Sequence, residues 1–208
     1  MSLRGLFITL EGPEGSGKSS QAKRLASTLR RAGCRVDVIR DPGSTVLGNR
    51  LRRMLLHTRE PISPLYEALL FIGGRVALVE ERIAPALARG RIVLCDRFHD
   101  STVAYQGYGG TLNPRWLDRL GRRAVGGRMP SLTVLLDVPT EQGFARIHRR
   151  HDRMEQKARR FHRRVRRGYL TLARREPKRF AVVDASRPQG EVGAAVRAAV
   201  CDHLKRHC

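Results

Sequence analysis

One short segment of the chain combines glycines, a lysine and a serine at a spacing that suits phosphate binding. Residues 12–19 are Gly-Pro-Glu-Gly-Ser-Gly-Lys-Ser and fit the pattern G-x-x-x-x-G-K-[ST]. A glycine-rich turn lets backbone N–H groups point at phosphate oxygens, and a helix that follows adds the positive end of its dipole. In this pattern the lysine reaches the β and γ phosphates of a nucleotide. We therefore expect a nucleotide to contact Gly12, Pro13, Glu14, Gly15, Ser16, Gly17, Lys18, Ser19 and Ser20.

A carboxylate that ends an apolar segment is the second group with a chemical role. Residues 91–96 are Arg-Ile-Val-Leu-Cys-Asp, which is typical of a buried strand that ends in Asp96. In phosphate-loop enzymes such an aspartate holds Mg²⁺ or its water ligands, and the serine of the loop binds the same ion. An aspartate after a strand is also a common helix cap. Because the phosphate loop is present, we predict Mg²⁺ as the cofactor, with Ser19 and Asp96 as its ligands.

The pattern of apolar residues predicts the elements that position these groups. Short β-branched runs alternate with longer helical patterns. Five strands separated by helices predict a three-layer α/β fold, with a five-stranded parallel sheet and helices on both faces. Ligands in such sheets bind beyond the carboxyl ends of the strands, where the phosphate loop, residues 41–43 and Asp96 would meet. The expected strands are 6–11, 35–40, 92–96, 132–138 and 180–184, and the expected helices include 19–32, 64–88, 114–125 and 155–176.

Length and composition predict a single domain over residues 1–208. The chain is 41% hydrophobic and has no linker or repeat that divides it. Its first apolar segment is too short for a signal peptide, and no apolar run has membrane length, so we expect a cytoplasmic protein without a membrane partner. The four cysteines are far apart, and we expect reduced thiols at Cys34, Cys95, Cys201 and Cys208, with Cys95 buried.

Several segments together resemble the thymidylate kinase family in order and spacing, over about residues 6–185. They are 7–21, 40–45, 67–71, 96–107 and 135–139; the segment 96–107, Asp-Arg-Phe-His-Asp-Ser-Thr-Val-Ala-Tyr-Gln-Gly, is the most specific to the family. The resemblance implies a phosphate-loop fold of the nucleoside monophosphate kinase type. It also implies transfer of the γ-phosphoryl group of ATP to dTMP, which gives dTDP and ADP. The acceptor is already an anionic oxygen, so the reaction needs alignment and charge neutralisation but no general base.

The same resemblance assigns roles in an acceptor pocket. Arg75 and Arg97 would clamp the acceptor phosphate, Phe71 would stack on thymine and Gln106 would hydrogen-bond the edge of the base. Taken alone, a helix arginine is more often solvated and a helix phenylalanine more often part of the core. The glycine pair 73–74 departs from the family, which usually has Asp or Asn before this arginine. The substrate-binding residues implied are Glu14, Pro42, Arg52, Phe71, Arg75, Arg97, Ser101, Thr102, Tyr105 and Gln106.

A mobile lid is the remaining part that such a kinase requires. The variable positions of the phosphate loop carry no basic residue, so an arginine that neutralises the transferred group must come from elsewhere. Residues 146–156 occupy the position of the family's lid. The predicted catalytic residues are therefore Lys18, Arg97, Arg149, Arg150 and Arg153.

The charge of the chain leaves a second function open. The formal net charge is +22, and residues 144–179 hold 15 basic and three acidic residues, or +12 of that excess. Such a segment would attract nucleic acid or another polyanion. Because it lacks the interleaved aromatic residues of single-strand binders, we favour solvated arginines on a helix. The alternatives to dTMP phosphorylation are another nucleoside monophosphate acceptor and a polyanion-binding relative; the resemblance also implies a homodimer.

Overall fold

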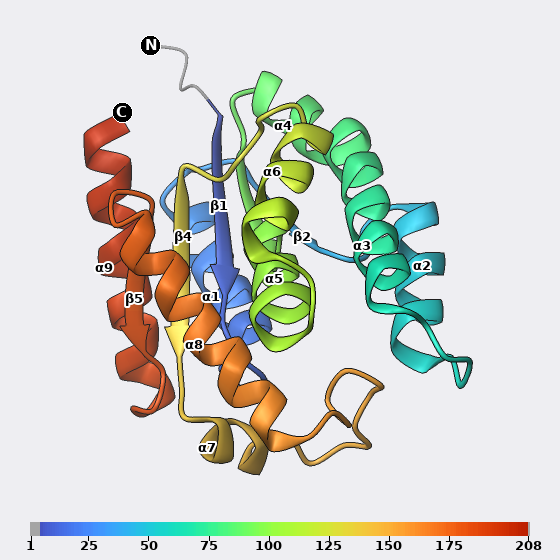
Figure 1. Ribbon diagram of the computed structural model, residues 1–208. Coiled ribbons are helices and arrows are strands. Elements are labelled where there is room, and N and C mark those ends of the chain that lie inside the picture. Colours follow the sequence, from blue (N-terminus) through green and yellow to red (C-terminus); the bar gives the residue numbers. More distant parts are fainter. Residues whose placement is uncertain (1–4, 208) are drawn as a thin grey trace.

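Five parallel strands form the centre of the molecule in the computed structural model, which describes residues 5–207 (Figure 1). Their order across the sheet is β2-β3-β1-β4-β5, and every neighbouring pair is parallel. The predicted sheet is confirmed, and each strand boundary lies within one residue of its expected position. The strands are β1 (Leu6–Glu11), β2 (Val36–Arg40), β3 (Ile92–Asp96), β4 (Leu132–Asp137) and β5 (Phe180–Asp184).

Helices cover both faces of the sheet, which confirms the three layers. On one face, α1 (Lys18–Arg31) and α9 (Gln189–His207) enclose a core that includes Ile8 and Val134. Figure 1 shows α8 (Arg159–Arg175) in front of the sheet and α1 behind it. The strands β1, β3 and β4 are buried along almost their whole length, because helices pack on both of their sides.

The predicted helix 64–88 is one continuous segment with a wider turn inside it. It consists of α3 (Pro64–Leu78), a π-helical turn η1 (Val79–Ile83) and α4 (Ala84–Ala88). The wide turn ends two residues before Pro85, which has no N–H to donate to the preceding turn. Gly74 lies where α2 (Val46–His57) crosses α3, since a Cβ at this position would lie 3.0 Å from Leu51 Cδ1. Gly74 therefore allows close helix packing here, whereas Gly73 is exposed and a Cβ there would meet open space.

The helix predicted at 155–176 begins four residues later, so this boundary was wrong. The backbone N–H groups of Met154 and Glu155 donate to Asp152, and the N–H of Asp152 donates to the carboxylate of Glu155. These contacts hold the segment in a turn, so that the helix begins only at Arg159. Helix α6 (Pro114–Ala124) agrees with its prediction. Five further elements were not among the predicted ones: α2, α5 (His99–Thr102), η2 (Val103–Gly109), α7 (Thr140–Ala145) and α9.

Two other expectations concern single features of the chain. Cys34, Cys95 and Cys201 are free thiols and Cys95 is buried in β3, as predicted; Cys208 and residues 1–4 lie outside the described residues. Within residues 5–207, no helix combines the length and the apolar character needed to span a membrane.

Candidate active site

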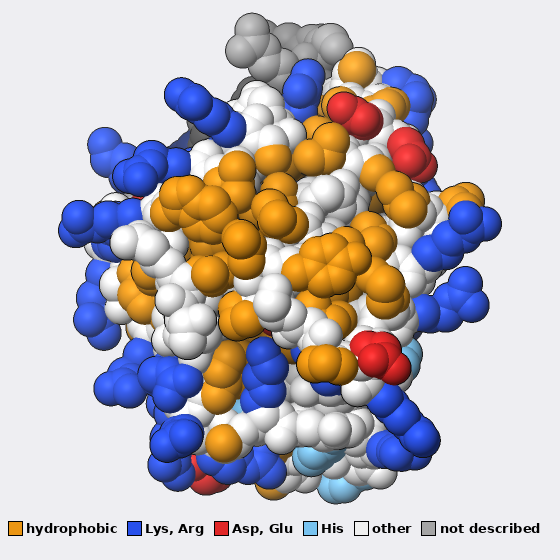
Figure 2. Space-filling view, turned by 45° about the vertical axis from the view of Figure 1, so that its right-hand side comes forward, with side chains coloured by type: hydrophobic (Ala, Val, Ile, Leu, Met, Phe, Trp, Pro, Cys, Tyr) orange, Lys and Arg blue, Asp and Glu red, His pale blue; other side chains and the backbone are white. Residues whose placement is uncertain are grey.

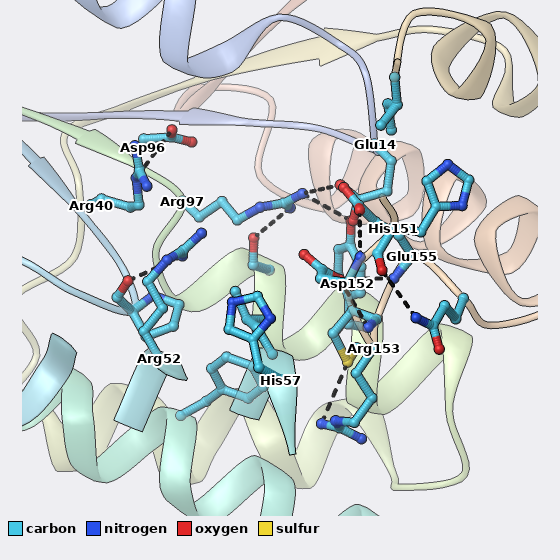
Figure 3. A pocket seen from close by; sticks show the side chains of 18 of the residues that line it. Glu14, Arg40, Arg52, His57, Asp96, Arg97, His151, Asp152, Arg153 and Glu155 are labelled. Carbon is cyan, nitrogen blue, oxygen red and sulfur yellow. Dashed lines mark hydrogen bonds and ion pairs between the residues drawn. The ribbon is translucent and has the colours of Figure 1, made fainter. Parts of the chain in front are cut away.

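A cleft of about 1430 Å³ opens at the carboxyl ends of the strands. Figure 3 shows its charged side chains, with Arg40 beside Asp96 on one side and Glu14 and Arg97 toward the other. Three of the predicted loop residues, Gly12, Pro13 and Ser16, do not line the cleft and belong to the body of the loop. The predicted residues that line it are Glu14, Gly15, Gly17, Lys18, Ser19, Ser20, Pro42, Arg52, Phe71, Arg75, Asp96, Arg97, Ser101, Thr102, Tyr105, Gln106, Arg149, Arg150 and Arg153.

The phosphate loop needs its glycines because the backbone of β4 and α7 lies directly against it. Gly12 has φ 144° and Gly15 has φ 67°, which side chains rarely adopt. A Cβ at Gly12 would lie 2.3 Å from the carbonyl oxygen of Leu136, and one at Gly15 would lie 1.8 Å from that of Gly143. Residues larger than glycine are therefore excluded at positions 12 and 15, on both conformational and steric grounds.

Lys18 is folded into the mouth of this loop. Its Nζ donates to the carbonyl oxygen of Pro13 at 2.7 Å and to Ser16 Oγ at 3.0 Å, and its side chain is buried. Burial and the nearby Arg97 lower the pKa of the ammonium group to about 8, although nearby carboxylates act in the opposite direction. A polyphosphate bound in the loop would place negative charge beside this ammonium group and favour its charged form.

Ser19 and Asp96 form the second element of the site. The Ser19 hydroxyl donates to Asp96 Oδ2, so the start of α1 and the end of β3 meet at these two oxygens. Arg40 lies 3.9 Å from the same carboxylate. A hydroxyl and a carboxylate oxygen are hard ligands of the kind that Mg²⁺ takes together with phosphate oxygens and water. The pair therefore fits a magnesium ion that is shared with a nucleotide.

Arg97 is the most extensively bound side chain in the cleft. Its backbone has φ 69°, a left-handed conformation that is uncommon for residues other than glycine. Its NH2 group donates to Glu14 at 3.1 Å and to the Tyr105 hydroxyl at 3.0 Å, while NH1 donates to Ser101 and Tyr169. Although burial acts against ionisation of Glu14, Arg97 and Lys18 outweigh it and lower the pKa of that carboxyl. The guanidinium is therefore fixed at the centre of the cleft.

Glu11, at the end of β1, contacts Ser101 and Tyr169, the same two residues that accept hydrogen bonds from Arg97. The sequence analysis did not identify Glu11 as a site residue. Its carboxylate accepts hydrogen bonds from the Phe98 N–H at 2.7 Å, from Ser101 Oγ at 2.7 Å and from the Tyr169 hydroxyl at 3.1 Å. Burial and the nearby Asp100 raise the pKa of Glu11 to about 7. The signal that could have indicated it is an acidic residue at the end of an otherwise apolar central strand.

Arg75 lies inside the protein, although a solvated side chain is the ordinary expectation for a helix arginine. Its side chain is 1% exposed, forms an ion pair with Asp41 at the end of β2 and donates to Thr102 Oγ1 at 2.9 Å. Its NH1 nitrogen and Asp41 Oδ1 are buried and have no hydrogen-bond partner among the described residues. A buried guanidinium with a free donor in a cleft wall is suited to bind an anion.

The remaining residues predicted for acceptor binding line the same cleft as Arg75. Arg52 donates to the carbonyl oxygen of Pro42 at 3.3 Å, and burial lowers the pKa of its guanidinium. Phe71 is half-buried in the cleft wall, so it is not wholly part of the core. Gln106 lies inside the π-helical η2, where its amide nitrogen donates to Glu67 at 2.8 Å. A single π-helical turn is a common way to aim side chains at a functional site.

The predicted lid, residues 146–156, belongs to an irregular segment that joins α7 to α8 and ends at residue 158 (Figure 1). Arg149 is exposed and forms a bidentate ion pair with Glu155 at 2.7 and 2.8 Å. Arg153 donates to the Leu55 carbonyl oxygen at 2.7 Å and to Glu67. Arg150 is exposed, and its side chain has no partner among residues 5–207. The three lid arginines therefore differ in their contacts, and of the three only Arg153 contacts described residues outside the lid segment.

The basic residues that follow the lid are more often paired than a solvated surface would require. Arg166 forms a bidentate ion pair with Asp137 at 2.7 Å, Arg163 contacts Glu141, and Arg164 donates to the Gly109 carbonyl oxygen. Arg179 binds the buried Asp100. Several of the basic side chains of this segment thus pair with groups of the same chain, while Arg160 and Arg167 remain exposed.

The fold and this cleft define a phosphate-loop kinase, because one end of the cleft suits a polyphosphate and the other a second anion. Comparisons with known proteins agree. A family model described as thymidylate kinase matches residues 10–196. The thymidylate kinases of Deinococcus radiodurans and Thermomicrobium roseum are each 50% identical to this chain, over 201 and 203 residues; both cover 96% of it, and the matches cover 98% and 96% of those proteins.

A solved structure gives the same result. The crystal structure of thymidylate kinase from Ehrlichia chaffeensis superimposes with a TM-score of 0.78 at 31% identity, covering 95% of this chain and 98% of that one. The chain belongs to the thymidylate kinase family, whose members are phosphotransferases.

Proposed function

We propose that this chain phosphorylates dTMP to dTDP with ATP as the donor, and that it does so by alignment and charge neutralisation without a general base. The observation that carries the proposal is the placement of Lys18, Arg97 and Arg75 in one cleft, with the unpartnered nitrogen of Arg75 at its far wall. Lys18 would contact the β and γ phosphates of ATP, and Arg75 the phosphate of dTMP. Arg97 lies between them and would contact the transferred group.

The role of Glu14 in this mechanism is to hold Arg97 and not to remove a proton. Its carboxylate accepts from Arg97 and from the Tyr105 hydroxyl, and its pKa is below the ordinary value. The acceptor oxygen of dTMP is already anionic at neutral pH, so no proton has to leave it. Glu14 would also lie near the deoxyribose, where its free lone pairs could accept from a hydroxyl.

Ser19 and Asp96 would hold Mg²⁺ in this scheme. The ion, when bound with the nucleotide, neutralises charge on the β and γ phosphates. The hydrogen bond between Ser19 and Asp96 supports the proposal, because it places the two oxygens side by side.

Arg149 and Arg150 are the lid residues that we assign to the transferred phosphoryl group. Both are exposed at the rim of the cleft, and Arg149 needs only to exchange Glu155 for a phosphate oxygen. We assign Arg153 to anchoring, since Glu67 and the Leu55 carbonyl oxygen already bind it.

The test is an assay of ADP release with each nucleoside monophosphate in turn as acceptor. We expect dTMP to give the highest kcat/KM, with dUMP next and dCMP and the purine nucleotides far lower. A higher kcat/KM for any other acceptor would assign the chain a different substrate.

We further propose a homodimer. Figure 2 shows hydrophobic side chains gathered across one face of the molecule. Helix α3 packs against both α2 and α6, and these helices carry the exposed hydrophobic residues Val46, Leu47, Met54, Leu65, Tyr66, Leu69 and Trp116. An apolar patch of this kind marks an interface. Light scattering would check it, with Leu69→Arg expected to give monomers.

A further inference from the structure

Glu67 is a buried carboxylate that connects the acceptor pocket to the lid. It lies on α3, and its side chain is 4% exposed. Gln106 Nε2 donates to Oε1 at 2.8 Å, Arg153 donates to Oε2, and Lys157 Nζ lies 3.6 Å from Oε1. One acidic side chain therefore contacts a residue of the pocket and two cations of the lid segment.

These contacts fix which end of the Gln106 amide faces the cleft. A carboxylate that is paired with Arg153 and Lys157 can only accept hydrogen bonds. Gln106 must then give its NH₂ group to Glu67. Its oxygen accepts no hydrogen bond from any residue in the described part of the chain, and Gln106 lines the cleft.

We propose that Glu67 sets the base preference of the acceptor pocket by holding the Gln106 amide with its oxygen toward the base. The inference rests on the proposed function. Thymine and uracil present an N3–H donor at their pairing edge, whereas cytosine presents a lone pair at N3. An acceptor oxygen at Gln106 matches the donor of thymine and repels the lone pair of cytosine, which excludes the wrong base as well as favouring the right one.

Glu67 is thus a positioning residue, because it acts through Gln106 and does not touch the base. The lid contributes to the same arrangement. Arg153 is held to the body of the protein by the Leu55 carbonyl oxygen, which keeps its guanidinium against Glu67. Lys157 also lies 4.6 Å from the ring centre of Phe161, which fixes the second cation.

The direct test is Glu67→Gln, which keeps the size of the side chain but can donate as well as accept. The Gln106 amide can then turn over and present its NH₂ group to the base. We expect kcat/KM for dTMP to fall about 10- to 100-fold relative to dCMP, as for a misdirected buried hydrogen bond. KM for ATP should stay within about twofold, since Glu67 is remote from the phosphate loop.

Three matched variants separate polarity from mere support. Glu67→Asp keeps an acceptor-only group, so the preference for dTMP over dCMP should persist even if activity falls. Arg153→Gln removes the lid contact, but Glu67 can still only accept hydrogen bonds. This variant should lower kcat/KM for dTMP and for dCMP by the same factor. The exchange Glu67→Gln with Gln106→Glu places a carboxylate at the base edge and should restore a preference for dTMP.

The outcomes are distinguishable from a failure of the proposed function. If the unmodified chain does not prefer dTMP, the function is wrong. If it prefers dTMP and Glu67→Gln keeps the same ratio of dTMP to dCMP, only the inference about Glu67 is wrong. Should Glu67→Gln not fold, the exchange variant and Glu67→Asp carry the test, and loss of the dTMP preference in both would overturn the proposal.

Discussion

The arginines on the floor of the cleft and those of its lid differ in how firmly the chain holds them. Arg75 and Arg97 are bound by Asp41, Thr102, Glu14 and hydroxyl groups, and they face the cleft from fixed positions. The exposed guanidinium of Arg149 is bound by Glu155 alone, among carboxylates of the described residues, and Arg150 is also exposed.

This difference indicates a division of tasks. The floor is arranged before substrate binds, so it needs no reorganisation during the reaction. The lid arginines must exchange water or Glu155 for phosphate, so their contribution depends on closure. The predictions below test this contrast in order of decreasing effect.

The largest effect is expected when the phosphate loop loses its charge. Lys18→Ala should lower kcat by about 10³-fold, because a buried ammonium group no longer faces the transferred phosphate. The melting temperature should change little, since the Nζ contacts only the loop itself. Steady-state phosphorylation of dTMP and a thermal melt would check both, and a near-normal rate would overturn the assignment of Lys18.

The lid pair should have the next largest effect, and on a different constant. Replacing Arg149 and Arg150 by Gln should lower kcat by about 10²-fold while KM for dTMP changes little, because these groups act in the transition state. Arg153→Gln is the matched comparison and should change KM as well as kcat. Equal kinetic patterns in the two variants would contradict the separation between acting and anchoring residues.

The pH dependence should distinguish the free protein from its complex. The pKa of Lys18 is about 8 in the free site and about 10.5 in water, so the ammonium form is lost as pH rises through 8. We expect kcat/KM for ATP to fall by about tenfold per pH unit above that value. Bound phosphates favour the charged form, so kcat should stay level to higher pH. A parallel decline of both constants would show that another group titrates.

The smallest effect is expected for the exposed arginines that follow the lid. Arg160, Arg163 and Arg167 lie on α8, and the ion pair of Arg163 with Glu141 is solvent-exposed. Surface pairs of this kind contribute little to stability, because solvent screens them. Their joint replacement by Gln should leave dTMP turnover within about twofold while reducing any DNA binding and its salt dependence. A loss of turnover as large as that of the lid variant would move the transferred-group contact to α8.

The sequence predicts those parts of the site whose chemistry depends on neighbouring residues. The phosphate loop depends on the spacing of glycines and a lysine within eight residues, and its strand and helix follow from periodicity alone. Arg75 is different, because it pairs with Asp41, which lies 34 residues away and meets it only in the folded chain. Its role came from the family resemblance and could not be derived from spacing.

Glu67 and the lid show where the prediction stopped. Glu67 precedes an apolar helix stretch, and nothing local indicates that Gln106, Arg153 and Lys157 converge on it. The late start of α8 depends on side-chain contacts of Asp152 and Glu155 with nearby N–H groups, which compete with helix formation and carry no periodic signal.

The close approach of the phosphate loop to α7 also fixes where the lid is mounted. A Cβ on Gly143 would lie 2.2 Å from the Glu14 carbonyl oxygen, so both this position and Gly15 must stay without side chains. The lid begins at Arg146, directly after α7. Its base is therefore set against the phosphate loop by main-chain contact, independently of any charged side chain. In the proposed mechanism the lid would turn about this fixed base, and its arginines could change without moving the base away from the phosphate loop.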